Sequence, residues 1–358
     1  MKKPKLKKIK NIRSRIRERK ESLPAIAGGR KSVPRITNET IAAHREEVIS
    51  GARKHIYPLR HTANRIIFIT SSLLVVGVIA FFSYCTLALY RFKSTSEFTY
   101  RVTQVIPFPI ARVGGSYVSY ESYLFEIRHY VHYYEQQQKV DFNSPEGKQQ
   151  LKLFKKQAID KVINDAYIKK LAAKQHVTVT SQQIDDQIKI LRAQNRLGGS
   201  DKVFEDVLRD YWGWSVKDFR RSLSDSILTQ NLAESLDTAT TTKATAAEAK
   251  LNSGTDFAAV AKEYSDDTAT KDNGGDIGVV DSSKRDLTAQ TVSALYKLKP
   301  GQYSPIINIG YSLEILKNIE TMSDGKIHGA HILFNFKDIT PQLNDMKDKQ
   351  KARVYVTF

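Results

Sequence analysis

The sequence predicts a single transmembrane helix, then a mostly helical domain, then a smaller domain that mixes helices with β-prone segments. Three observations support this division. Residues 66–90 contain no charged side chain, whereas apolar residues recur at helical spacing in residues 111–237. Residues 238–358 combine an apolar helical face with glycine-rich turns and a β-prone end, RVYVTF. About 265 residues follow the uncharged run, which is enough for two domains.

The predicted transmembrane helix has the sequence IIFITSSLLVVGVIAFFSYCTLALY and lies between Arg65 and Arg91. It exceeds the roughly 20 apolar residues that a helix needs to cross a bilayer. Tyr84 and Tyr90 lie near one end, where aromatic rings favour the membrane interface. The alternative is a buried core helix. A cleaved signal peptide is disfavoured because about 65 residues precede the run and no A-x-A sequence follows it.

Residues 1–65 are predicted to be a basic, largely disordered cytoplasmic arm. They contain 19 Lys and Arg against five Glu and no Asp, so most of the net charge of +18 lies here. Basic segments stay on the cytoplasmic side of a membrane, which predicts a single-pass protein with extracytoplasmic C-terminal domains. Only residues 40–53 look helical. We expect the arm to be solvated or to bind anionic lipid, with no specific nucleic acid, although DNA binding is an alternative.

Residues 91–110 are predicted to be a stalk. Their sequence includes TYRVTQVIPFPI, whose β-prone alternation stops at Pro107 and Pro109. We expect the stalk to hold the following domain a short distance from the membrane. The only cysteine, Cys85, lies in the apolar run, so no intramolecular disulfide can form.

Residues 111–237 are predicted to fold into five helices. Ser119 and Ser181 are placed to cap helices, and Ser215 with Asp218 forms a capping-box pattern before another helix. The segments IARVGGSYVSYESYLFEI, AAKQHVTVTSQQID and WGWSVKDFRRSLSDSILTQNL resemble the N-terminal helical domain of SurA- and PrsA-type foldases. This resemblance implies a chaperone domain that holds unfolded chains.

A Thr/Ala stretch, Thr238 to Thr245, is expected to link to the last domain. Next come a helix in DFAAVAKEYSDD, the sequence GGDIG, a short helix, KPGQYS and G-Y-x-x-x-I-L. In this order and spacing these landmarks resemble the parvulin (PpiC-type) class of peptidyl-prolyl isomerases. The resemblance implies an α+β domain with an antiparallel sheet across residues 238–358.

The position of one strand departs from the parvulin pattern. Parvulins begin with a strand containing A-x-H-I-L, and nothing similar lies between Leu236 and Phe257. Instead, GAHILF occurs late, within residues 328–335. We expect a circular rearrangement in which this late strand fills the central place in the sheet, because pairing depends on position in space. The alternative is a second, truncated parvulin domain.

The resemblance implies three catalytic positions. Asp267 falls where parvulins carry a central Cys or Asp, and His331 falls at their first active-site histidine. Ser312 replaces their second histidine. Considered alone, Asp267 could cap a loop, and His331 in an apolar strand could be a structural core histidine.

The resemblance also places the substrate-binding wall at Leu287, Thr291 and Tyr296. Leu287 and Thr291 stand where Met and Phe are usual in the family, and Tyr296 keeps an aromatic ring nearby. With one histidine absent and the wall altered, we expect weak or lost isomerase activity. The reaction needs no metal or cofactor. His129 and His132 lie one helical turn apart, but no Cys or carboxylate pattern completes a zinc site.

The sequence therefore predicts a membrane-anchored extracytoplasmic foldase. Its expected partners are unfolded or proline-containing polypeptides and the lipid bilayer. The alternatives are a catalytically inactive parvulin-fold chaperone and a membrane-tethered binding protein.

Overall fold

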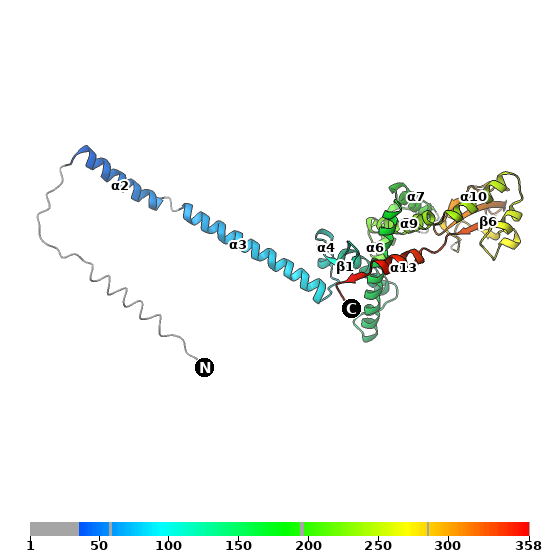
Figure 1. The fold of residues 1–358 in the computed structure, drawn as a ribbon, viewed down its shortest axis with the longest axis horizontal. Helices are drawn as coiled ribbons and strands as arrows, with labels where there is room; N and C mark the ends of the chain where they lie inside the picture. Colours follow the sequence, from blue (N-terminus) through cyan, green and yellow to red (C-terminus); the bar gives the residue numbers. More distant parts are fainter. Residues whose placement is uncertain (1–35, 57–58, 194–196, 285, 358) are drawn as a thin grey trace. The chain divides into compact units, whose positions relative to one another are not determined.

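The computed structural model describes residues 36–56, 59–193, 197–284 and 286–357 (Figure 1). Contacts divide the chain into two compact units, Met1–Ala80 and Phe81–Phe358, which are described separately. The second unit contains the expected mostly helical part and the expected α+β part with an antiparallel sheet.

The described part of the first unit consists of α2 (Asn38–Ile56) and the larger part of α3 (Leu59–Thr86). Helix α2 extends the helix expected at residues 40–53 by a few residues at each end. The most basic stretch of the predicted arm, residues 1–35, lies outside the described residues.

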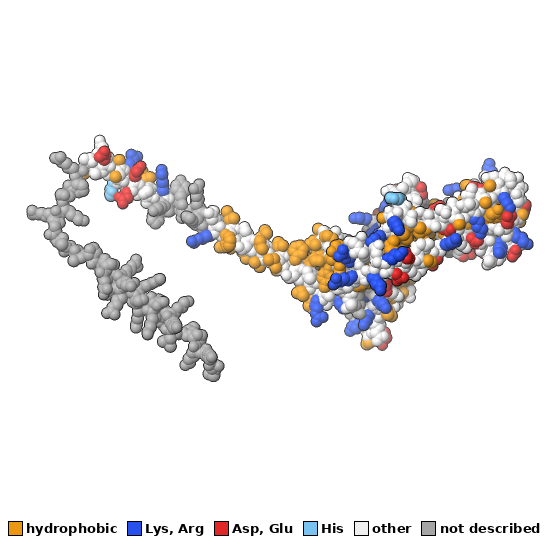
Figure 2. Space-filling view, in the orientation of Figure 1, with side chains coloured by type: hydrophobic (Ala, Val, Ile, Leu, Met, Phe, Trp, Pro, Cys, Tyr) orange, Lys and Arg blue, Asp and Glu red, His pale blue; other side chains and the backbone are white. Residues whose placement is uncertain are grey.

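Helix α3 carries the uncharged run. Together with the following π-helical turn η1 (Leu87–Arg91), it provides a 28-residue helical span, Asn64–Arg91, with a mean hydropathy of 2.5. Hydrophobic side chains cover its surface in Figure 2. Among the described residues it is the one helix whose length and composition would let it cross a membrane.

The last turns of the apolar run are buried on one side, whereas Leu87 on the other side is 54% exposed. Cys85 and Leu89 are only 2% and 1% exposed. The Tyr120 hydroxyl donates to the Leu89 carbonyl at 2.6 Å, and the Tyr90 hydroxyl donates to the Pro109 carbonyl at 2.6 Å. The Tyr90 ring is partly buried and packs against the core of the helical domain, so its expected position at the membrane interface stays a prediction.

The segment expected to be a stalk is folded onto the helical domain. It contains α4 (Glu97–Val105), which begins where the Ser96 hydroxyl accepts the Thr99 amide at 3.3 Å. Thr99 and Thr103, one turn apart, are buried against the domain. The β-prone alternation misled the prediction because a serine cap and an acidic first turn favour a helix here.

The helical domain begins with a hairpin of β1 (Pro109–Val113) and β2 (Ser116–Ser119). Its five helices are α5 (Tyr120–Gln136), α6 (Pro145–Lys174), α7 (Ser181–Ala193), α8 (Asp201–Trp212) and α9 (Val216–Leu236). The predicted cap at Ser119 and the predicted capping box of Ser215 and Asp218 both form. The cap expected at Ser181 is provided instead by Thr180, whose hydroxyl accepts the Gln183 amide at 3.2 Å.

The expected Thr/Ala linker is the first half of a helix, α10 (Thr238–Asn252). The Asp237 carboxylate caps it, and its small residues Ala244 and Ala247 are fully buried against the sheet of the last domain. Alanine has the highest helix propensity, and small side chains let a helix approach a sheet closely, so this composition suits a packed helix.

The α+β part contains α11 (Phe257–Tyr264), η2 (Lys271–Asn273), β3 (Asp276–Val280), α12 (Ala289–Leu295), β4 (Ile307–Asn308), β5 (Ser312–Thr321) and β6 (Ile327–Asn335). The four strands form an antiparallel sheet in the order β3-β6-β5-β4. The late strand β6 thus occupies an inner position, between β3 and β5, as the proposed rearrangement requires.

The last elements return to the helical domain (Figure 1). Strand β7 (Ala352–Val354) pairs antiparallel with β1, and α13 (Thr340–Lys349) places Leu343 in the core of the helical domain. The Tyr167 hydroxyl donates to the Gln350 carbonyl at 2.6 Å. Residues 238–358 were all assigned from the sequence to one domain. In the structure, α13 and β7 pack with the helical domain instead.

Candidate functional site

His331 and Asp267 are brought together although 64 residues separate them. His331 lies in the middle of β6, and Asp267 lies in the loop after α11. His331 Nε2 and Asp267 Oδ2 are 2.8 Å apart. The loop is fixed against β6 because the Asp266 amide donates to the Leu333 carbonyl at 2.7 Å and the Leu333 amide donates to Ser265 Oγ at 3.1 Å.

Asp267 is held as a carboxylate by further donors. Thr270 Oγ1 donates to Asp267 Oδ2 at 2.5 Å, and the Ala269 amide donates to Asp267 Oδ1 at 3.0 Å. Partial burial opposes ionisation, but these bonds and His331 lower the pKa of Asp267 below its usual value. About a fifth of this side chain is exposed. Asp267 is therefore a fixed anion with access to solvent.

Glu314, on β5, is a member of this cluster that the sequence analysis missed. Its residue surface is 1% exposed, and its Oε1 lies 2.7 Å from His331 Nδ1. Thr291 Oγ1 donates to Glu314 Oε2 at 2.6 Å. The signal was present in the sequence: a single acid interrupts the apolar run of a buried strand, SLEIL, and a buried charge needs partners.

The imidazole of His331 lies between two carboxylates. Burial disfavours its charged form, but the hydrogen bonds and charges of Glu314 and Asp267 outweigh burial and raise the pKa of His331. The ring is 9% exposed, so water screens these interactions only slightly.

The glycine pair of GGDIG lets the backbone approach β6. The His331 amide donates to the Gly275 carbonyl at 2.8 Å. Gly275 has a φ of +79°, and a Cβ there would lie 2.1 Å from the His331 carbonyl oxygen. Only glycine fits this position, which explains the landmark in physical terms.

Ser312 does not join the cluster. It pairs in the sheet with Asn335, and its Oγ donates to Asn335 Oδ1 at 2.9 Å. His331 pairs with Leu316, farther along the same two strands. Ser312 thus occupies the predicted strand position but makes its side-chain bond away from His331.

The three expected wall residues have different surroundings. Thr291 reaches the cluster through Glu314 and is 1% exposed. Leu287 packs with the apolar cluster that contains Val292 and Leu295. Tyr296 is 38% exposed, and its hydroxyl donates to the Val280 carbonyl at 3.1 Å. Thr291 is linked to His331 by hydrogen bonds through Glu314.

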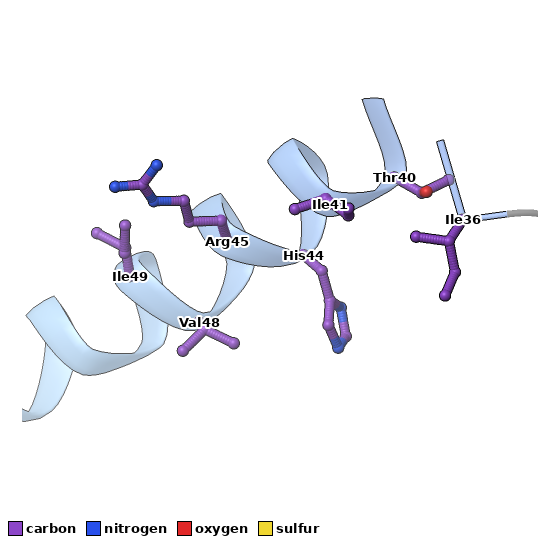
Figure 3. Close-up of a pocket in the computed structure, with 7 residues that line it drawn as sticks. All are labelled: Ile36, Thr40, Ile41, His44, Arg45, Val48 and Ile49. Atoms are coloured by element: carbon purple, nitrogen blue, oxygen red, sulfur yellow. The ribbon is translucent and has the colours of Figure 1, made fainter. Parts of the chain in front are cut away.

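Other candidate features lie elsewhere. His129 Nδ1 is 3.3 Å from the Trp212 carbonyl oxygen, and His132 Nε2 is 3.2 Å from the Asp210 carbonyl oxygen, so both rings contact the end of α8. A hollow beside α2 is lined by residues between Ile36 and Ile49 (Figure 3). All its lining residues belong to α2 or to the two residues before it, and all of them are exposed. The hollow therefore does not enclose a ligand.

Two family models match the chain. The one described as a SurA-like N-terminal domain matches residues 58–233, and the one described as a PPIC-type PPIase domain matches residues 227–320. The first match includes the segment that was expected to be a stalk. The second ends before β6, the strand that carries His331.

Similar curated proteins are named foldase protein PrsA. The protein of Caldanaerobacter subterraneus subsp. tengcongensis is 27% identical over 192 residues, which cover 48% of this chain and 59% of that protein. The protein of Geobacillus sp. (strain WCH70) is 31% identical over 167 residues, covering 44% of this chain and 54% of that protein. The matches thus span little more than half the length of these two relatives.

Among solved structures, a crystal structure of a peptidylprolyl isomerase (PrsA) from Bacillus anthracis is 19% identical to this chain. The alignment covers 53% of this chain and 86% of that chain, with a TM-score of 0.18.

Proposed function

We propose, since this chain belongs to the SurA/PrsA-type foldases, that it binds unfolded polypeptides and isomerises X-Pro peptide bonds in them. The observation that carries the isomerase part is the contact of Asp267 with His331 at 2.8 Å. Two residues that the parvulin resemblance assigns to catalysis meet here from distant parts of the chain.

Isomerisation of an X-Pro bond requires no bond to be made or broken by the side chains. Rotation about an X-Pro bond is opposed by a barrier of roughly 18–20 kcal/mol from amide resonance, so an isomerase must favour the twisted amide over the planar one. No nucleophile or metal is needed. The Asp267–His331–Glu314 cluster offers polar groups that are already fixed by hydrogen bonds and do not need to reorganise as the amide twists.

We propose that turnover is weak. Ser312 bonds to Asn335 instead of adding a second group beside His331, and the Tyr296 hydroxyl bonds to the Val280 carbonyl. A tenfold to hundredfold acceleration would require only about 1.4–2.7 kcal/mol of preference for the twisted amide. The alternative is a parvulin-fold chaperone with no isomerase activity.

We also propose that the chain is anchored in the cell membrane once, with its helical and α+β domains outside and its basic arm in the cytoplasm. The exposed apolar surface of α3 and the charge of residues 1–65 support this topology. The arm would contact anionic lipid. The helical domain would hold unfolded or proline-containing chains for the isomerase domain.

The test compares three versions of the full chain in detergent, with a proline peptide as substrate. We expect the wild type to accelerate cis/trans conversion above the uncatalysed rate and Asp267→Ala to return it to that rate. Ser312→Ala is the matched control and should retain wild-type activity, because Ser312 makes its side-chain bond outside the cluster. If the wild type and Asp267→Ala both show only the uncatalysed rate, the isomerase proposal is wrong and the chaperone without isomerase activity remains.

A further inference from the structure

Both ring nitrogens of His331 contact a carboxylate oxygen. Nδ1 lies 2.7 Å from Glu314, and Nε2 lies 2.8 Å from Asp267. A neutral imidazole has one N–H donor and one acceptor nitrogen, whereas an imidazolium has two donors. Two ionised carboxylates at these distances are therefore satisfied together only by a doubly protonated ring.

Glu314 is itself fixed on its other side. Thr291 Oγ1 donates to Glu314 Oε2 at 2.6 Å, and Thr291 Oγ1 lies 2.8 Å from Thr288 Oγ1. Thr288 caps α12 by accepting the Thr291 amide at 3.1 Å. The start of α12 thus determines where the Glu314 carboxylate lies, and this carboxylate determines the orientation of the His331 ring.

The charged groups near this cluster have other partners. His328, on the same strand as His331, lies 2.8 Å from Asp276, and Asp266 pairs with Lys243 at 2.5 Å. Thr270 and Thr291 contribute hydroxyl donors and no charge. Asp267 and Glu314 are therefore the two carboxylates that contact the His331 ring.

We propose that Glu314 is a positioning residue, which holds His331 as an imidazolium and thereby keeps Asp267 ionised and oriented toward the substrate. The role of Asp267 rests on the proposed isomerase function, but the state of His331 does not. Glu314 is buried and acts through the His331 ring. It stabilises the ring at Nδ1, whereas Asp267 contacts Nε2.

The experiment follows the histidine ring nitrogens by NMR in the full chain, labelled with ¹⁵N-histidine, across a pH titration. In the wild type, both His331 nitrogens should stay protonated above the ordinary histidine midpoint of 6.5. Glu314→Gln keeps the side-chain shape and removes the charge. We expect it to lower the His331 midpoint by about one pH unit or more, a tenfold loss of proton affinity.

Asp276→Asn is the matched control, because it removes a carboxylate from His328 on the same strand. It should change the His328 signals and leave the His331 midpoint unchanged. Should Glu314→Gln fail to fold, Thr291→Val removes one hydrogen bond from Glu314 and should shift the His331 midpoint or broaden its ring signals. A His331 titration that is the same in wild type and in the folded Glu314 or Thr291 variant would overturn the proposal.

Activity separates this inference from the proposed function. If Glu314 positions a catalytic cluster, the pH at which isomerase activity falls should move with the His331 midpoint in Glu314→Gln. If Glu314→Gln shifts the His331 midpoint but the wild type has no isomerase activity, the proposed isomerase function is refuted and the positioning role of Glu314 is retained. Isomerase activity with a pH profile unchanged by Glu314→Gln would refute the positioning role and retain the isomerase.

Discussion

At the scale of single residues, the burial of Glu314 determines which side chains of the site must pair with one another. Glu314 is 1% exposed, and a buried carboxylate is stable only when it is paired and hydrogen-bonded; here His331 and Thr291 provide both. The same pairing orders the imidazole. A buried acid beside a histidine and a partly exposed Asp267 therefore form one electrostatic unit rather than three separate residues.

Gly275 allows a test of the close backbone contact between the GGDIG turn and β6. Gly275→Ala should strain a residue with a φ of +79° and drive its Cβ against the His331 carbonyl oxygen. The left-handed conformation alone costs about 1–2 kcal/mol for an alanine. We expect a loss of unfolding free energy at least about 1 kcal/mol larger than that, because two backbone segments must move apart.

Gly278→Ala is the matched control, since Gly278 also has a positive φ, +71°, but its Cβ would meet no atom within 4 Å. Urea denaturation of both variants measures the difference. Equal destabilisation would show that the contact between Gly275 and His331 does not constrain the fold.

At the scale of elements, residues distant in sequence complete the helical domain. Leu343 on α13 is 5% exposed and belongs to the core of that domain. Leu343→Ala should lower the unfolding free energy by about 2–5 kcal/mol, as is typical of a buried leucine. Leu153→Ala on α6 is the control, because Leu153 is 61% exposed and its truncation should cost less than about 0.5 kcal/mol.

Intrinsic tyrosine and tryptophan fluorescence during denaturation follows both leucine variants, because the buried tyrosines lie in the helical domain. If Leu343→Ala leaves the unfolding of this domain unchanged, then α13 does not stabilise it. A large effect of Leu153→Ala would instead indicate that the exposed face of α6 is covered by another surface.

Local signals in the sequence were sufficient where a few neighbouring residues decide the structure. Ser119 and the pair Ser215 and Asp218 cap helices as predicted, because a cap depends on residues three positions apart. Composition misled where packing decides: the Thr/Ala stretch after Asp237 is a helix whose alanines face the sheet. Helix α4 was missed although a serine cap and an acidic first turn favour it, because the alternation of its residues looked β-prone.

Only the site residues that the resemblance to parvulins implies could be predicted from the sequence. Asp267 and His331 were identified from the resemblance to parvulins and meet in the structure, but their catalytic role stays a prediction. Glu314 was missed because its contact with His331 depends on β5 lying beside β6, and the acid in SLEIL indicates a buried charge without naming its partner. Strand β7 was expected with the last domain for a similar reason: its pairing with β1 joins residues more than 200 positions apart.

At the scale of the whole molecule, the topology decides whether the proposed foldase can meet secreted chains. The uncharged run lies in a helix whose side chains are exposed from Ile66 to Tyr84, and the charge excess precedes it. We expect protease added to intact cells that express the chain to digest the helical and α+β domains. The basic arm, detected by an epitope at its start, should remain protected.

The controls for this topology are permeabilised cells, in which the arm should be lost as well, and a variant in which the Lys and Arg of residues 1–65 are replaced by Gln. Removing the positive charge should weaken the preferred orientation, because cytoplasmic retention depends on Lys and Arg close to the span. A protected α+β domain beside a digested arm in intact wild-type cells would reverse the topology. The cluster around His331 would then face the cytoplasm, where it could act only on chains that have not been exported.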